Sequence, residues 1–241
     1  MFRRLIDGLV EILYPGACPA CKRRIKGRDS AELVCAGCWN AIQRNLPPFC
    51  HSCGRQLQKT GFSKSICPQC VKKKLHFDRA FSPCAYEGVV KNLIHEFKYK
   101  GKDYLGRPLS RLMIDFIKEY NLPLDYVDYI IPVPLHQAKK REREFNQSEV
   151  LSGFIGREFN KAVAPDSLIR LRRTKTQAGL GIEERLKNVT GSFSAGGKPA
   201  LRGKNILLVD DVLTSGATSS EASLALKNAG ANIVFVLTLA N

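Results

Sequence analysis

Apolar residues recur at helical spacing in four segments of the chain and at strand spacing in several others. The helical segments are 87–99, 105–120, 145–159 and 219–229. Continuous or alternating apolar runs, which predict strands, occupy 77–86, 126–133, 188–194, 206–212 and 233–239. Strands and helices therefore alternate from residue 77 onward. This order predicts an α/β fold whose mostly parallel sheet is covered by helices on both faces.

The strand predicted at 206–212 carries the most chemistry. Its apolar run predicts burial in a parallel sheet, and it leads into two adjacent carboxylates, Asp210 and Asp211. In open α/β sheets, ligands bind beyond the carboxyl ends of the strands. The acid pair can hold ribose hydroxyls or hydrated Mg²⁺ there. The loop 214–218 adds backbone N–H groups and hydroxyls at a helix N-terminus, which is a binding place for phosphate.

Two other interpretations of this segment are disfavoured by its residues. An ordinary acidic turn would leave Asp210 and Asp211 repelling each other, unless a cation or a hydroxyl group lies against them. A nucleotide-binding P-loop requires a lysine directly after its glycine, and none follows Gly216. The whole run 206–218 instead resembles the motif with which type I phosphoribosyltransferases bind 5-phosphoribosyl-1-pyrophosphate (PRPP).

Eight cysteines upstream of the predicted sheet form an internal repeat. Each copy has two C-x-x-C pairs separated by thirteen residues: Cys18, Cys21, Cys35 and Cys38, then Cys50, Cys53, Cys67 and Cys70. Two C-x-x-C turns complete a tetrahedral Cys₄ site, so the repeat predicts two structural zinc ions. We expect each copy to close on itself, with ligation interleaved between the copies as the alternative.

A disulfide framework is disfavoured because residues 1–14 do not have the pattern of an export signal, with Asp7 and Glu11 inside the apolar stretch. Iron–sulfur ligation fits the ribbon-like spacing less well than zinc. The ninth cysteine, Cys84, is expected to be a small buried residue on a strand. These features predict a cytoplasmic protein. The amphipathic segment 2–13 would dock on protein or, as the alternative, lie on the inner face of the membrane.

Positive charge is concentrated in the cysteine-rich part of the chain. The 241 residues carry a net charge of +16. Residues 1–82 hold 15 Lys and Arg against 5 Asp and Glu, a net of +10, and the remainder holds 23 against 17, a net of +6. We expect two domains, an N-terminal helix with a double zinc ribbon at 1–74 and the sheet domain at 75–241. A basic ribbon favours contact with nucleic acid, with a merely soluble surface as the alternative. The sequence has no run of 18 apolar residues, so it predicts no transmembrane segment.

Two further motifs narrow the resemblance. Pro132-Val-Pro-Leu-His136 is followed by Lys139, Arg141, Arg143 and Phe145-Asn146-Gln147, and a second run begins with Leu171-Arg-Arg-Thr-Lys-Thr-Gln-Ala178 and continues to Phe193. Together with the double ribbon, these motifs resemble the ComF family of ComFC-type competence proteins over nearly the full chain. One residue departs from the family pattern, because Glu144 stands where the family usually has glycine.

The resemblance implies a role for each part of the site. The catalytic pair Asp210 and Asp211 would hold the ribose hydroxyls of PRPP and organise Mg²⁺. The 5-phosphate would bind Thr214, Ser215, Gly216, Ala217 and Thr218. The pyrophosphate would face Pro134, Leu135 and His136, with Lys139, Arg141 and Arg143 neutralising it. The segment 172–190 would form a lid that turns Arg172, Lys175, Gln177 and Arg185 inward. For the charged run 139–144, a solvated helix start is the alternative.

The resemblance also implies a function. ComF proteins are associated with natural competence, the uptake and processing of single-stranded DNA alongside a helicase-like ATPase. The basic ribbons would then bind DNA or dock that partner. Phosphate contacts would dominate, because the ribbons have few aromatic residues, namely Trp39, Phe49 and Phe62. The alternative is an active PRPP-dependent phosphoribosyltransferase, of the glycosyltransferase class, acting on a base or another nucleophile. A scaffold that docks proteins without touching DNA is a third interpretation.

Overall fold

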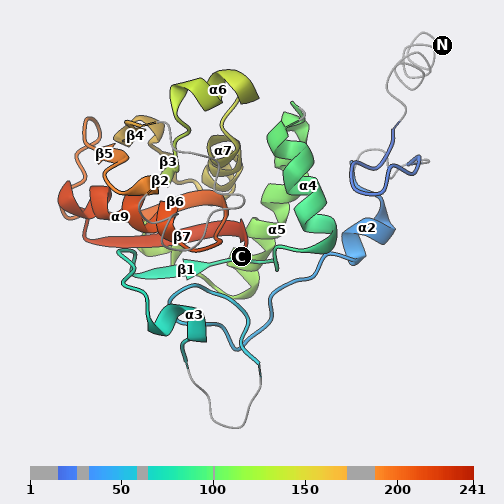
Figure 1. Cartoon of the computed structure of the whole chain (residues 1–241), viewed down its shortest axis with the longest axis horizontal. Coiled ribbons are helices and arrows are strands. Elements are labelled where there is room, and N and C mark those ends of the chain that lie inside the picture. The colour runs from blue at the N-terminus through green and yellow to red at the C-terminus, as the bar shows by residue number, and fades with distance from the viewer. Residues whose placement is uncertain (1–15, 26–32, 59–64, 100, 173–187) are drawn as a thin grey trace.

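A central parallel sheet organises the chain (Figure 1). The computed structural model describes residues 16–25, 33–58, 65–99, 101–172 and 188–241. The sheet has five strands in the order β1-β7-β6-β2-β3, and every neighbouring pair is parallel. Its strands are β1 (Arg79–Phe81), β2 (Tyr129–Pro132), β3 (Ala162–Val163), β6 (Asn205–Val212) and β7 (Ile233–Ala240).

Helices cover both faces of this sheet, as the sequence predicted. One face is covered by α4 (Gly88–Tyr99), α5 (Gly106–Glu119) and α7 (Gln147–Phe159), and the other by α9 (Ala217–Asn228). The alternation of side chains along β6 shows the division. Leu207 and Val209 belong to the core beneath α4, α5 and α7, whereas Leu208 belongs to the core beneath α9. Residues 206–209 are all buried, as expected for a central parallel strand.

Shorter elements complete the chain. They are the helices α2 (Ala36–Asn40), α3 (Pro68–Val71) and α6 (Gln137–Arg143), the strands β4 (Leu168–Arg170) and β5 (Phe193–Ala195), and 3₁₀ turns at Asp103–Leu105, Leu124–Tyr126 and Pro165–Ser167. β4 and β5 pair antiparallel in a separate small sheet. In the part of the chain that the structure describes, no helix combines the length and the apolar character needed to cross a bilayer.

The structure departs from the predicted elements mainly at the edges of the sheet. The run 77–86 forms only the three-residue strand β1. Pro83 has no N–H to continue the pairing, and Cys84 makes only single bridges to Arg44 and Ala240. The predicted strand at 188–194 forms only at its end, in β5, which pairs with β4 rather than with the main sheet. β3, β4 and α6 are too short to leave a periodic pattern, and the helix expected at 2–13 lies outside the described residues.

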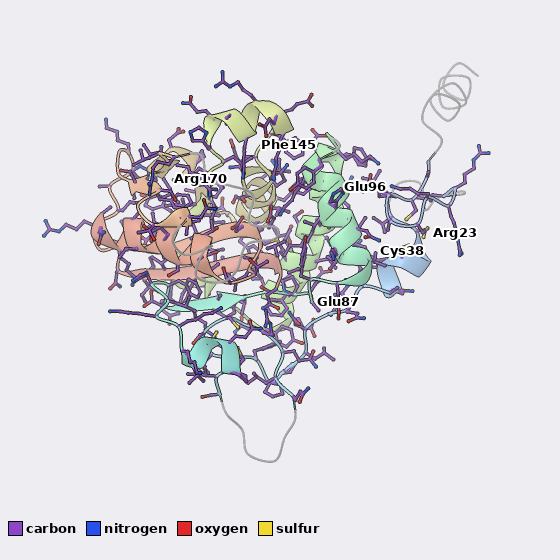
Figure 2. All side chains as sticks on the ribbon, in the orientation of Figure 1. Arg23, Cys38, Glu87, Glu96, Phe145 and Arg170 are labelled. Carbon is purple, nitrogen blue, oxygen red and sulfur yellow. The ribbon has the colours of Figure 1, made fainter. Side chains whose placement is uncertain are left out.

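The two cysteine ribbons pack into different cores. Residues of the first ribbon, such as Ile25 and Ile42, join the core beneath α4, α5 and α7, and the four cysteines of the second join the core beneath α9. The first ribbon is also tied to α4 by an ion pair of 2.8 Å between Lys22 and the buried Glu96. Glu96 faces the ribbon that carries Arg23 and Cys38 (Figure 2). Each ribbon therefore packs against the helices that cover one face of the sheet.

Candidate functional site

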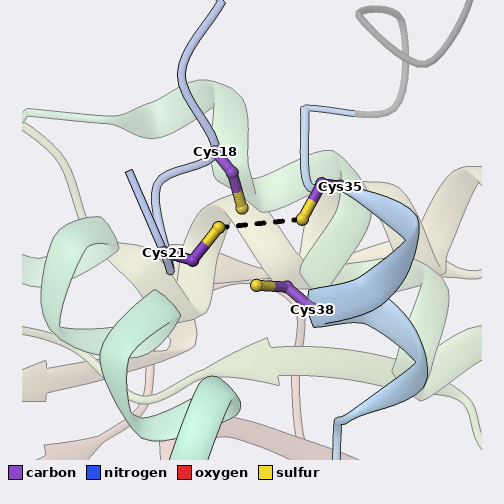
Figure 3. A group of neighbouring side chains, drawn as sticks. All are labelled: Cys18, Cys21, Cys35 and Cys38. Carbon is purple, nitrogen blue, oxygen red and sulfur yellow. Dashed lines mark hydrogen bonds between the residues drawn. The ribbon is translucent and has the colours of Figure 1, made fainter. Parts of the chain in front are cut away.

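The eight cysteines of the repeat form two groups of four. Cys18, Cys21, Cys35 and Cys38 make one group (Figure 3), and Cys50, Cys53, Cys67 and Cys70 make the other, with the sulfur atoms of each group within 4.8 Å of one another. Each copy therefore closes on itself, as expected, and the interleaved alternative is wrong. The cysteines are free thiols, which also excludes a disulfide framework.

The spacing of the sulfur atoms fits zinc. The Sγ–Sγ distances are 3.8 Å between Cys21 and Cys35 and 3.7 Å between Cys53 and Cys67. A disulfide bond would be about 2.05 Å long. A tetrahedron with Zn–S bonds of about 2.3 Å has edges of about 3.8 Å, which matches both distances. With four thiolates and no open position, each site is structural rather than catalytic.

The two ribbons repeat their hydrogen bonds as well as their spacing. The N–H of Cys18 donates to the carbonyl of Arg23 at 2.8 Å, and the N–H of Cys50 donates to that of Arg55 at 2.7 Å. Burial alone would raise the pKa of the first thiol in each ribbon, but backbone N–H groups directed at the sulfur lower it to about 7 for Cys18 and Cys50. These N–H groups favour the thiolate form that binds metal.

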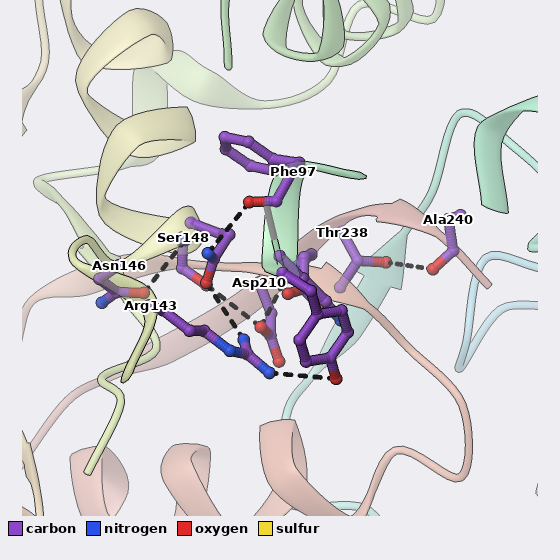
Figure 4. Close-up of polar contacts among 11 residues, drawn as sticks. Phe97, Arg143, Asn146, Ser148, Asp210, Thr238 and Ala240 are labelled. Carbon is purple, nitrogen blue, oxygen red and sulfur yellow. Dashed lines mark hydrogen bonds and ion pairs between the residues drawn. The ribbon is translucent and has the colours of Figure 1, made fainter. Parts of the chain in front are cut away.

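At the carboxyl end of β6, the two adjacent acids have the partners that the sequence required of them. The Nζ of Lys98, at the end of α4, lies 2.7 Å from Asp211. The hydroxyl of Ser148, at the start of α7, donates to Asp210 at 3.2 Å, and the N–H of Asp211 donates to the same oxygen at 2.9 Å. Figure 4 shows Ser148 and Arg143 converging on Asp210. A cation and a hydroxyl thus lie against the pair, which is the condition that adjacent carboxylates impose.

The two carboxylates of the pair lie in different electrostatic environments. Burial, followed by the charge of Asp211, raises the pKa of Asp210 to about 7. Burial works to lower the pKa of Lys98, but the ion pair with Asp211 and the field of Asp210 hold it above its usual value. Lys98 therefore stays charged, while Asp210 is close to half-protonated at neutral pH. A site with one fixed charge pair and one titrating acid is suited to exchanging a proton for a metal ion or a ribose hydroxyl.

The loop after β6 has the geometry of an anion site. Gly216 precedes α9 with φ at 80°, a left-handed conformation that favours glycine. The N–H of Ala217 donates to the hydroxyl of Ser215 at 3.3 Å. The loop stands at the N-terminus of a twelve-residue helix, where the helix dipole attracts phosphate. Its neighbours Thr214 and Thr218 are exposed and half-buried, respectively.

The predicted pyrophosphate residues are only partly brought to the acid pair. Leu135 and His136 are half-buried in the loop after β2, and the ring Nδ1 of His136 accepts from the N–H of Ala138 at 3.3 Å as the cap of α6. Arg143 reaches toward the site, donating to the hydroxyl of Tyr99 at 3.3 Å. Arg141 is exposed, and Lys139 is half-buried. The charged run is thus a helix, and its last arginine points toward the acids (Figure 4).

Two residues of the Phe-Asn-Gln motif, Asn146 and Gln147, hold neighbouring elements in position, a role that the sequence alone does not indicate. The amide of Asn146 caps α7 by accepting from the N–H of Ser148 at 3.2 Å, and it donates to the carbonyl of Val133 at 3.1 Å. Gln147 donates to the carbonyl of Phe97 at 3.3 Å. Asn146 therefore fixes Ser148 against Asp210, and Gln147 fixes the end of α4 that carries Lys98.

Most of the expected lid lies outside the described residues, including Lys175, Gln177 and Arg185. Arg172 is described, and it donates to the carbonyl of Thr190. Sequence reasoning missed a neighbouring cation, Arg170 on β4. Burial lowers the pKa of Arg170, and the field of Asp210 opposes that shift, so this guanidinium is close enough to Asp210 to interact with it. Lys98 and Ser148 were missed as well, because nothing in their local sequence connects them to residue 210.

Glu144 has a left-handed backbone conformation of the kind that favours glycine. Its φ is 68° and its ψ is −29°, at the C-terminal cap of α6. A left-handed conformation costs a residue with a Cβ about 1 kcal/mol or more. Glu144→Gly is therefore expected to raise the melting temperature by about 2–4 °C in differential scanning calorimetry. Glu142→Gly, in the right-handed body of α6, is the matched control and should lower it. A loss of stability in both variants would contradict the assigned strain.

Comparison with known proteins identifies the family. The family model described as the double zinc ribbon domain matches residues 9–79. Competence protein F of Haemophilus influenzae is 30% identical over 210 residues, which cover 86% of this chain and 90% of that protein. The DNA utilization protein YhgH of Salmonella typhi is 27% identical over 227 residues, covering 92% and 96%. The chain therefore belongs to the competence protein F family, as its motifs predicted.

Among solved structures, the glutamine phosphoribosylpyrophosphate amidotransferase of B. subtilis, complexed with ADP and GMP, matches with a TM-score of 0.40 at 20% identity. The match covers 59% of this chain, which spans only 30% of that chain. The fold assignment rests on the parallel sheet, the double ribbon and the family rather than on this match.

Proposed function

We propose that this chain binds PRPP with Mg²⁺ at the carboxyl end of β6 and acts in the handling of single-stranded DNA. The observation that carries the proposal is the acid pair Asp210–Asp211, held between Lys98 and Ser148 and followed directly by a loop at a helix N-terminus. A phosphorylated ribose needs this combination, because its hydroxyls bind carboxylates while its phosphate binds backbone N–H groups.

Each group of the ligand has a partner in this arrangement. Asp210 and Asp211 would accept hydrogen bonds from the ribose hydroxyls, and the loop 214–218 would bind the 5-phosphate. Arg143, with Lys139 and Arg141 from the same helix, would neutralise the pyrophosphate. Asp210 and Asp211 would also hold Mg²⁺, which would supply positive charge to offset the negative charge of the pyrophosphate. The protein's contribution is to orient the sugar and to stabilise negative charge.

A thermal-shift panel on the native chain tests this half of the proposal. The chain would be heated with Mg²⁺ together with PRPP, ribose 5-phosphate, pyrophosphate or inorganic phosphate. A ligand at 100 times its dissociation constant stabilises the folded state by about 2.7 kcal/mol, so PRPP should raise the melting temperature by several degrees. The fragments should raise it less. No shift with PRPP, or an equal shift with inorganic phosphate, would overturn the assignment of the ligand.

A groove beside the first ribbon supports the DNA half of the proposal. It has a volume of about 530 Å³ and is lined by Trp39 of the ribbon and by Arg107, Arg111 and Lys118 of α5. Two acids also line it, Asp115 in an ion pair with Arg111 and Glu158 in an ion pair with Lys118, so a bound strand would have to compete with these acids for two of the three cations. An aromatic ring beside basic side chains is the combination that a single strand needs, because its bases stack and its phosphates need neutralising. Two relatives point the same way, since they are named for competence and for DNA utilization. Phe49 packs edge-on against Phe116 and Tyr120, so it supports the core rather than a base.

Fluorescence anisotropy with a labelled single-stranded oligonucleotide tests the DNA half. We expect the affinity to fall steeply between 50 and 200 mM salt, since counterion release dominates such contacts. Trp39→Ala and Arg111→Ala should each weaken binding, whereas Arg202→Ala, an exposed arginine far from the groove, should not. Binding that hardly changes with salt, or that Arg202→Ala weakens as much as Arg111→Ala, would contradict this interface.

An active phosphoribosyltransferase is the second candidate function. Tyr99 favours it, because the residue is 53% exposed beside the site, with the guanidinium of Arg143 4.9 Å from its ring centroid and the ring of His95 also packed against it. Such a ring offers a platform for an acceptor base next to C1 of the ribose. In the reaction, the bond from C1 to pyrophosphate breaks with its electron pair, a bond from C1 to the acceptor forms, and the acceptor loses a proton. Pyrophosphate release with a panel of bases would support it, and release with none would leave PRPP as a bound ligand only.

The proposal also covers the protein's localisation, its domain boundaries and a protein partner. We assign the chain to the cytoplasm, where thiols stay reduced and free to bind zinc. We also propose that the double ribbon, residues 1–74, is one domain and that 75–241 is the other. A helicase-like ATPase is the expected protein partner. Co-purification of that ATPase with the native, full-length chain would support the partner, and failure to co-purify would contradict it.

A further inference from the structure

The second zinc ribbon directly contacts the loop 214–218, the proposed 5-phosphate site, which we call the phosphate loop. A narrow crevice between them is lined by Cys53, Cys70 and Lys73 from the ribbon side and by Leu213, Ser215 and Gly216 from the loop side. Two of the four metal ligands of the second site therefore lie against the loop that would bind the 5-phosphate. The first ribbon has no such contact with this loop among the described residues, since it packs on α4 instead.

One lysine connects the metal site to the loop. The backbone N–H of Lys73 donates to the carbonyl of the metal ligand Cys70 at 3.1 Å, which ties its main chain to the zinc turn. Its Nζ donates to the carbonyl of Ser215 at 3.0 Å. The peptide bond between Ser215 and Gly216 is trans, so the carbonyl and the following N–H point in opposite directions. The N–H of Gly216 therefore points away from Lys73, and the hydrogen bond from Lys73 fixes its direction.

One apolar contact and one polar contact further restrict the loop and the helix that follows it. A Cβ at Gly216 would lie only 3.3 Å from the Cδ2 of Leu75, so the loop has little room to move toward the ribbon. Further along α9, the hydroxyl of the buried Ser220 accepts from the N–H of His76 at 3.0 Å and lies 3.1 Å from its Nδ1. The segment 73–76, which follows directly from the second metal site, thus contacts both the loop and the first turn of the helix behind it.

We propose that the second zinc ribbon is a working part of the PRPP site. Lys73, Leu75 and His76 act as positioning residues, holding the phosphate loop in its binding conformation, so that order at the second metal site raises affinity for the phosphate end of PRPP. This inference rests on the proposed PRPP site. By linkage, PRPP in turn raises the affinity for zinc of the second site but not of the first.

The test compares two neighbouring lysines in the full-length, zinc-loaded chain. Calorimetric titration with PRPP and Mg²⁺ should show binding about fivefold to tenfold weaker in Lys73→Met than in the native chain, a coupling typical of linked sites. Lys74→Met removes the same charge at an exposed position and should leave the affinity unchanged. Both variants should keep two zinc ions per chain, so that the change cannot be ascribed to metal loss.

A second variant separates positioning from direct contact with the ligand. Ser220 is buried in α9 against His76, out of reach of a phosphate in the loop. Ser220→Ala should therefore also weaken PRPP binding if the ribbon acts through position, and should have no effect if Lys73 simply touches the ligand. Equilibrium competition with a colorimetric chelator supplies a readout that does not measure PRPP affinity: PRPP should make one of the two zinc ions harder to remove in the native chain and neither of them in Lys73→Met.

The outcomes distinguish this inference from the proposal beneath it. Failure of the native chain to bind PRPP would overturn both. Normal PRPP binding by Lys73→Met and Ser220→Ala, with zinc affinity unaffected by PRPP, would overturn the coupling and leave the PRPP site intact. Weakening in Lys73→Met alone would make Lys73 a ligand contact and also overturn the positioning role.

Discussion

Replacing Asp210 and Asp211 together by asparagine is expected to weaken PRPP binding by about 100-fold while the chain stays folded. The change keeps the shape of both side chains but removes the charges that would face Mg²⁺ and the ribose hydroxyls, and losing buried charged contacts of this kind costs about 2–4 kcal/mol. Calorimetric titration measures the loss. Asp115→Asn, a half-buried acid on α5 paired with Arg111, is the matched control and should bind normally.

The stability of the single variant Asp210→Asn gives an independent check on the same residue. The folded state raises the pKa of Asp210 from 3.8 to about 7. Folding therefore favours the neutral acid, and the stability that this contributes at low pH is lost as the pH rises through 7. Asparagine is neutral at every pH, so the variant should melt a few degrees higher than the native chain at pH 8 and at the same temperature near pH 4. A variant that is less stable at pH 8 would contradict the assigned burial of charge.

The second large effect is expected from the zinc sites. Cys21 and Cys53 occupy equivalent positions in the repeat, but Cys21 is exposed whereas Cys53 is buried with the other three ligands of its group. Because the second site is continuous with the core beneath α9, Cys53→Ser should lower the melting temperature by about 10 °C, and Cys21→Ser by clearly less.

Metal analysis measures the zinc content of these two variants, and calorimetry measures their melting temperatures. Each variant should hold one zinc ion fewer than the native chain, and only Cys53→Ser should show a broad, low transition. Equal falls in melting temperature, or two zinc ions retained in both variants, would contradict the unequal burial of the sites.

The parts of the fold that sequence could predict are those with long periodic patterns. Helix α5 and strand β6 were predicted closely, because their apolar faces repeat over several turns or run unbroken. The zinc groups followed from spacing alone. β3 and β4 have only two and three residues, and their strand character depends on partners far along the chain. Tertiary pairing of this kind leaves no local signal.

The candidate site shows the same limit in chemical terms. The acids and the phosphate loop are contiguous in sequence, so a motif could reveal them. Lys98 and Ser148 reach the acids only because α4 ends and α7 begins at the same edge of the sheet. The repulsion between two adjacent carboxylates called for a cation or a hydroxyl group beside them, which was the only sign of either residue in the sequence. Glu144 was noticed as a departure from the family pattern, and its left-handed backbone explains why glycine is usual there.

The most direct test of the account is a calorimetric titration of the native chain with PRPP, with and without Mg²⁺, at pH 6, 7 and 8 in buffers of different ionisation enthalpy. Binding should require Mg²⁺, strengthen by about tenfold from pH 6 to pH 8, and release a proton, because Asp210 must lose its proton to serve the ligand. In Asp210→Asn, whatever binding is left should lack this proton release. An absence of heat at every pH, or Mg²⁺-independent binding with no proton released, would contradict a PRPP site on the Asp210–Asp211 pair.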